Sequence, residues 1–73
     1  MLLSDFIKEK RNSAKLTQPE LAEKAGVGIR FIRELEQGKE TLRLDKVNQV
    51  LKLFGYQIGA IPINRQIISD EKS

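Results

Sequence analysis

Apolar residues recur at the spacing of an α-helix in four separate segments of this chain. The predicted helices run from residue 3 or 4 to 14, between residues 17 and 26, from 29 to 37 and from 44 to 54. After Gly55 the period changes, because residues 56–63 alternate and include β-branched side chains and a proline. This last pattern predicts one short strand with an edge proline.

The stretch from Thr17 to Gly38 contains the strongest local signals. Thr17 and Glu20 have the spacing of a capping box, in which each side chain bonds the backbone N–H of the other residue. Gly26 can adopt the left-handed conformation that ends a helix, and Gly38 provides a second stop. We therefore predict two short helices joined by a tight turn.

The apolar stripes of the first and fourth helices predict which side chains form the core, and Leu42 should also be buried. Ser4 is a possible N-cap of the first helix. The predicted stripe residues are Leu3, Phe6, Ile7 and Ala14 in the first helix, and Leu44, Val47, Val50, Leu51 and Phe54 in the fourth.

The composition excludes several classes of function. Seventy-three residues make one small domain, near the lower size limit for a self-sufficient core. The chain has no cysteine and no histidine, so we expect no catalytic residue, no metal and no cofactor. A net charge of +3 permits nucleic-acid binding without arguing for it. With no signal peptide and no apolar run of membrane length, we expect a cytoplasmic protein without a membrane partner.

The central stretch resembles the helix-turn-helix of the phage-repressor (XRE, Cro/CI-like) family. The residues that carry this resemblance, in register, are Gln18, Ala22, Gly26, Ile32 and Leu35, with Val27 and Glu36 also as the family has them. The resemblance implies an all-α, four-helix lambda-repressor-like domain over residues 1–55. We divide the rest of the chain into a dimerisation strand over 56–63 and a flexible tail over 64–73.

The resemblance also implies that the second helix of the motif enters the major groove of a double-stranded DNA operator. Arg30 and Arg33 are three residues apart and share one face, from which an arginine can donate two bonds to a guanine. The alternative is a solvated face, with Arg30 paired to Glu34. The full set of predicted DNA contacts is Gln18, Gly28, Ile29, Arg30, Arg33, Glu34, Lys39 and Arg43.

Several of these positions have two interpretations. Gln18 either contacts DNA at the N-terminus of its helix or is simply solvated. Ile29 either contacts a thymine methyl or belongs partly to the core, and Phe31 packs on the first two helices or lies against the sugar–phosphate edge. Arg43 contacts a phosphate or the minor groove. Gly28 departs from the usual serine or threonine cap, which weakens the helix start but allows a close approach to a phosphate.

The family resemblance implies an ion pair between Arg11 and Glu36. Such a pair would fix the first helix against the recognition helix while adding little net stability. The alternative is that Arg11 is solvated or faces a phosphate.

A single strand in a helical domain has unpaired backbone groups. Two copies related by a twofold axis could pair their strands, so we predict a homodimer with Tyr56, Ile58, Ala60 and Ile61 at the interface. The alternative is a tail without fixed structure. A short XRE domain with a C-terminal strand around KLFGYQIGAI is similar to HipB-type antitoxins (the HipB/Y4mF branch), and the likeness covers about residues 1–61. It implies autoregulation of a toxin–antitoxin operon and a HipA-type kinase toxin as a partner.

The function we predict is sequence-specific DNA binding by a homodimeric transcriptional repressor. The alternative is a protein-interaction adaptor that has lost base contacts, which Gly28, Ile29 and the modest charge favour. An enzyme is nearly excluded, because the sequence has neither a phosphate-cradling glycine loop nor an obvious pair of catalytic carboxylates.

Overall fold

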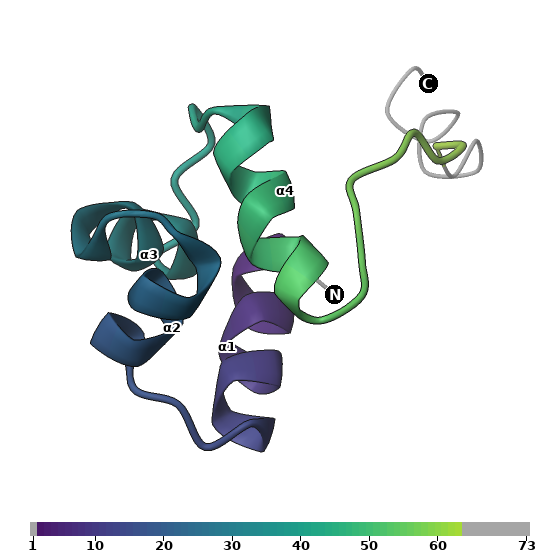
Figure 1. The fold of residues 1–73 in the computed structure, drawn as a ribbon. Coiled ribbons are helices and arrows are strands. Elements are labelled where there is room, and N and C mark those ends of the chain that lie inside the picture. The colour runs from purple at the N-terminus through teal and green to yellow at the C-terminus, as the bar shows by residue number, and fades with distance from the viewer. Residues whose placement is uncertain (1, 64–73) are drawn as a thin grey trace.

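The computed structural model describes residues 2–63 and contains four α-helices (Figure 1). The prediction of four helices is confirmed, and three of them end one residue earlier than expected. In this part of the chain no strand forms, and no helix is long and apolar enough to cross a membrane. The predicted tail over 64–73 lies outside the described residues. The helices are α1 (Leu3–Ser13), α2 (Gln18–Ala25), α3 (Ile29–Glu36) and α4 (Leu44–Leu53).

One core joins all four helices. Helix α3 packs against α1 and α2, and α2 also packs against α4. In Figure 1, α2 and α3 lie together on one side of the domain, and the segment after α4 leaves on the opposite side. Burying a large aliphatic side chain stabilises a fold by about 1.5–3 kcal/mol. The buried apolar residues are Ile7, Leu21, Ala22, Ile32, Leu35, Val47, Val50 and Leu51.

Four predictions about the helix ends are wrong. The N-cap of α1 is Leu2, which makes no side-chain capping bond, and Ser4 lies inside the first turn. Leu44 is 64% exposed and Leu3 is 38% exposed, and Ala14 is also exposed. Leu3 and Leu44 begin α1 and α4, and Ala14 follows α1, where the facing helices no longer cover them. Leu42 is half-buried against the core, close to the prediction.

The start of α2 is the capping box that the sequence predicts. The Glu20 backbone N–H donates to Thr17 Oγ1 at 3.2 Å, and the Thr17 N–H donates to Glu20 Oε1 at 2.8 Å. These bonds lower the pKa of the Glu20 carboxyl below its ordinary value. The carboxylate form of Glu20 is therefore the one that the fold stabilises, and this contribution is lost as the pH falls through the lowered pKa.

All four helices end in the same backbone motif, in which one residue adopts positive φ and two N–H groups turn back onto the last carbonyls. In α2, for example, the Gly26 N–H donates to the Glu23 carbonyl and the Val27 N–H to the Ala22 carbonyl. Glycine supplies the positive φ in three helices, but at the end of α1 a lysine does so. The four residues are Lys15 (φ 59°), Gly26 (φ 74°), Gly38 (φ 85°) and Gly55 (φ 83°).

Replacing Lys15 with glycine is expected to stabilise the protein by about 0.5–1 kcal/mol. The left-handed conformation costs an L-residue about 1–2 kcal/mol, and part of this gain is offset by the greater freedom of glycine in the unfolded chain. Urea unfolding measures the difference. Gly26→Ala is the matched control, with an expected loss of about 1 kcal/mol, because a Cβ there lies 3.7 Å from Gln49 Nε2 and does not clash. A less stable Lys15→Gly variant would contradict this account.

The segment after α4 is attached to the domain at two points. The Tyr56 ring lies edge-on to the Phe6 ring of α1, with centroids 4.8 Å apart, and Lys10 Nζ lies over both rings at 5.3 and 5.5 Å. The Ile58 backbone N–H donates to Asn48 Oδ1 of α4 at 2.8 Å. Residues 56–63 have no regular secondary structure within the chain. The predicted strand would pair with a second copy, so that pairing stays a prediction.

Candidate nucleic-acid interface

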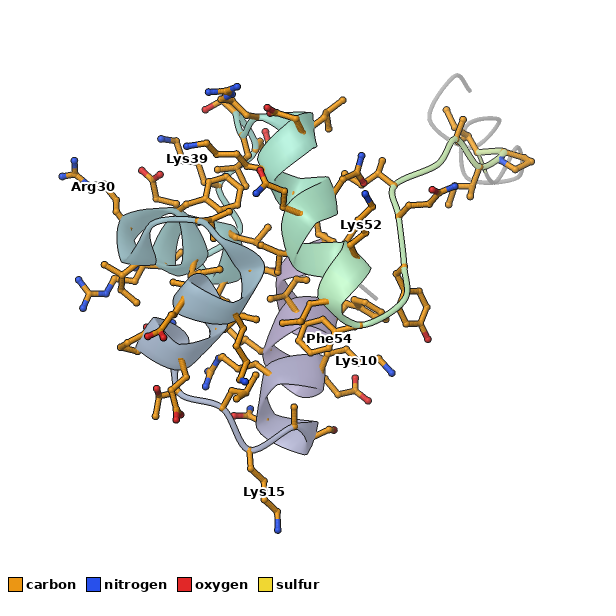
Figure 2. The ribbon with its side chains drawn as sticks, in the orientation of Figure 1. Lys10, Lys15, Arg30, Lys39, Lys52 and Phe54 are labelled. Carbon is orange, nitrogen blue, oxygen red and sulfur yellow. The ribbon has the colours of Figure 1, made fainter. Side chains whose placement is uncertain are left out.

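Helix α3 has one buried face and one exposed cationic face. Ile32, Leu35 and Glu36 are buried, whereas Arg30 and Arg33 are exposed. Figure 2 shows Arg30 pointing away from the domain, on the side opposite the segment after α4. Within residues 2–63, neither arginine forms an ion pair. The structure thus places the two predicted base-contacting residues together on an accessible face.

The N-terminal end of α3 has little capping. Gly28 is the N-cap and makes no side-chain capping bond. A Cβ at Gly28 would meet no atom within 4 Å, so glycine is not required there by packing. Ile29 and Phe31 are both half-buried against the core. Of the interpretations left open by the sequence, the structure therefore supports partial core packing for both side chains.

Lys39 and Arg43, the other two cations among the predicted DNA contacts, each have a carboxylate partner. Lys39 Nζ lies 3.0 Å from Glu34 Oε2, with the two side chains 46% and 33% exposed. This pair replaces the alternative of Arg30 with Glu34, for which the structure contains no bond. Arg43 donates from Nε and Nη2 to the two Asp45 carboxylate oxygens at 3.2 and 2.7 Å. The Arg43 hydrogen bonds lower the pKa of Asp45, so its carboxyl is ionised at neutral pH.

A second network lies beneath the cationic face and joins three helices. The Glu36 side chain is 2% exposed and accepts from Arg11 Nε at 2.7 Å and from Arg11 Nη2 at 3.1 Å. The structure therefore brings the two predicted partners together. Arg11 Nη1 also donates to the Leu16 carbonyl at 2.9 Å, which ties the α1–α2 turn to the same guanidinium.

Sequence reasoning missed the third member of this network. Gln18 Nε2, at the start of α2, donates to Glu36 Oε1 at 3.1 Å. The sequence predicts either a DNA contact or a solvated side chain for Gln18, whereas the structure gives Gln18 a partner inside the protein. The expected Arg11–Glu36 pair was the available signal for this bond. Two bonds from Arg11 leave the Glu36 oxygens able to accept more, so a buried Glu36 carboxylate calls for a further donor.

A protein-family model described as helix-turn-helix matches residues 7–61 of the chain. The chain belongs to the helix-turn-helix family. The match includes the whole of α2, α3 and α4, and thus the cationic face, the Glu36 network and both flanking ion pairs. The predicted resemblance to the XRE-type motif is confirmed.

Two curated relatives agree with this assignment. The helix-turn-helix chain is 52% identical, over 51 residues, to a protein of Sinorhizobium fredii (strain NBRC 101917 / NGR234) named an uncharacterized HTH-type transcriptional regulator, y4mF. That alignment covers 70% of this chain and 67% of the relative. The chain is 30% identical over all 73 residues to the immunity repressor protein of Bacillus phage phi105, of which it covers 51%. The chain thus spans about half to two thirds of the length of these relatives.

Within the part of the chain that the structure describes, Asp and Glu side chains form no cluster suited to a metal ion. The acidic side chains near α3 instead have cationic partners: Glu36 with Arg11, and Glu34 with Lys39. The chemistry available at this face of the helix-turn-helix domain is therefore the presentation of guanidinium and ammonium groups to an anion.

Replacing Arg11 with alanine is expected to lower the free energy of unfolding by about 3 kcal/mol. The substitution leaves the Glu36 carboxylate buried with only Gln18 as a donor, and an uncompensated buried charge is costly. Urea unfolding measures the loss. The matched control is Arg43→Ala, which removes an exposed pair (70% and 61% exposed) and should cost less than about 1 kcal/mol.

The double variant Arg11→Met with Glu36→Leu separates a lost charge partner from lost packing. It removes both charges and keeps apolar bulk, so we expect it to recover much of the stability that Arg11→Ala loses. Equal losses for Arg11→Ala and Arg43→Ala would contradict a structural role for the buried pair.

Proposed function

We propose that this protein is a sequence-specific DNA-binding transcriptional repressor whose recognition helix is α3. The observation that supports this function best is the contrast between the two faces of α3. Its buried face is fixed by Ile32, Leu35 and Glu36, and its exposed face presents two unpaired arginines within residues 2–63. A helix with this arrangement can enter a major groove and donate to guanine O6 and N7.

The residues around α3 extend this contact to the DNA backbone. Lys39 follows the end of α3, and Arg43 immediately precedes α4, so each would lie beside the groove that α3 enters. Figure 2 shows Lys39 on the same side of the domain as Arg30. Phosphate contacts of this kind fix the register of the protein without selecting a sequence. The names of the two relatives, a transcriptional regulator and a repressor, agree with the proposal.

Selection from a randomised duplex library tests sequence specificity. We expect enrichment of an inverted repeat, because a twofold dimer contacts two half-sites on one face of the duplex. Arg30→Ala or Arg33→Ala should weaken binding to the selected duplex by about 1–3 kcal/mol, and Arg30→Lys should lose preference at one position while retaining the charge. Titration by fluorescence anisotropy measures these effects.

Two controls accompany this experiment. Lys39→Ala should weaken binding to every duplex alike and reduce the salt slope by about one unit. Lys52→Ala changes a cation that Figure 2 places on the side of the segment after α4, and it should leave affinity unchanged. Equal affinity of the wild type for selected and mixed-sequence DNA contradicts the proposal. Absence of any salt-dependent DNA binding favours the protein-interaction adaptor instead.

We also infer that the repressor is a homodimer that uses the segment after α4. Among residues 2–63, the exposed large apolar side chains lie on the start of α1, on α4 and on this segment, with none on α2 or α3. Such a surface suits a second copy of the chain. The predicted interface residues are Tyr56, Ile58, Ala60 and Ile61, of which Ile61 is 84% exposed. Because the Ile58 N–H is bonded to Asn48, neighbouring residues would have to supply the intermolecular N–H bonds.

Replacing Ile61 with aspartate is expected to shift the protein from dimer to monomer. The substitution places two negative charges close together at the twofold interface and removes apolar area from it. Analytical ultracentrifugation measures the mass of the species at several concentrations. Asn12→Asp adds the same charge to an exposed position near the end of α1 and should leave the dimer intact. A monomeric wild type at micromolar concentration contradicts this proposal.

The finer assignment is that this repressor is a HipB-like antitoxin that regulates its own toxin–antitoxin operon and binds a HipA-type kinase. It is supported by the resemblance of residues 1–61, with the segment KLFGYQIGAI, to HipB-type antitoxins. The neighbouring reading frame tests it first. A kinase-like frame whose product forms a complex with this chain on co-expression supports the assignment, and a neighbouring product that forms no such complex contradicts it.

A further inference from the structure

The Lys39–Glu34 pair is positioned by the backbone at the end of α3. Gly38 has φ 85°, and its N–H donates to the Leu35 carbonyl at 3.2 Å. The next N–H, that of Lys39, donates to the Glu34 carbonyl at 3.1 Å. The same turn brings Lys39 Nζ to 3.0 Å from the Glu34 carboxylate. Lys39 is therefore attached to Glu34 through both its backbone and its side chain.

The Arg43–Asp45 pair is equally local. Arg43 occupies the N-cap of α4, and Asp45 lies in the first turn, where a negative charge is favoured by the free N–H groups. Two parallel bonds join the guanidinium to both carboxylate oxygens, at 3.2 and 2.7 Å. This fork is also the geometry in which an arginine binds two phosphate oxygens.

The four cations of the interface thus fall into two classes. Arg30 and Arg33, the proposed base contacts, have no carboxylate partner within residues 2–63. Lys39 and Arg43, the proposed contacts to the DNA backbone, each have a carboxylate partner from their own helix end. The cations that the protein neutralises are thus the two whose proposed phosphate contacts would add affinity without selecting a sequence.

We propose that Glu34 and Asp45 are internal competitors of DNA phosphate, which lower the affinity of the protein for a duplex of any sequence. The inference rests on the proposed function, because it describes the regulation of the same interface. Each carboxylate occupies its cation in the free protein. On binding, a phosphate must displace it or share the cation with it, and the two anions then lie well within one Debye length of each other.

The exposure of the two pairs makes this competition possible. Both are open to solvent, so each pair is weak enough for a phosphate to displace. The buried Arg11–Glu36 pair differs, since its carboxylate is 2% exposed and cannot be reached by DNA. Glu34 and Asp45 therefore affect binding, whereas Glu36 affects the fold.

The test uses Glu34→Gln and Asp45→Asn, which keep the size of each side chain and remove its charge. Affinity is measured for the duplex obtained by library selection and for a short duplex of mixed sequence, between about 50 and 200 mM salt. We expect each variant to bind both duplexes about three- to tenfold more tightly, with a steeper salt dependence, because one more cation is available to phosphate. Thermal unfolding verifies that the variants are folded.

Glu9→Gln is the matched control, because it removes the same charge from an exposed position on α1, which carries none of the predicted DNA contacts. If both test variants bind as Glu9→Gln does, the inference is wrong. If Glu34→Gln weakens binding to the selected duplex alone, Glu34 contacts a base and the inference is also wrong. If the wild type binds neither duplex, the proposed function fails and the inference falls with it, an outcome distinct from the other two.

Discussion

The carboxylate of Glu36 accepts three hydrogen bonds at the C-terminal end of α3, two from Arg11 on α1 and one from Gln18 on α2. Arg11 also donates to the Leu16 carbonyl, so the same guanidinium fixes the turn between α1 and α2. A charge that is 2% exposed is tolerated only where such donors surround it. The arrangement specifies where α3 lies relative to the other two helices more than it adds net stability.

The orientation of α3 decides what the exposed face can contact. Because Ile32 and Leu35 are buried and Glu36 is bonded, the opposite side of the helix, with Arg30 and Arg33, must face solvent. This fixed orientation is what base contact requires, since two parallel hydrogen bonds to a guanine tolerate little rotation of the donor. A buried network that does not itself contact DNA therefore controls the geometry of the side chains proposed to do so.

The ends of the helices also shape the proposed DNA interface. The same terminating motif ends all four helices, and at the end of α3 it turns Lys39 back over Glu34. The segment after α4 is held against the domain by two contacts, Tyr56 with α1 and the Ile58 N–H with α4. This segment lies on the side of the domain opposite Arg30 (Figures 1 and 2). The proposed surface for DNA and the proposed surface for a second copy therefore use different residues of one small domain.

The sequence by itself determined the four helices and the glycine turns that end α2, α3 and α4, because the capping box at Thr17, the positive-φ glycines and the apolar period act over only a few residues. It also indicated the family, since the positions of the motif are fixed by the close packing of α2 and α3. Only the tertiary structure decided that Gln18 bonds Glu36, that Glu34 pairs with Lys39 rather than Arg30, and that Leu44 is exposed. These outcomes depend on how closely helices and turns approach one another in space, which the local pattern of the chain does not contain.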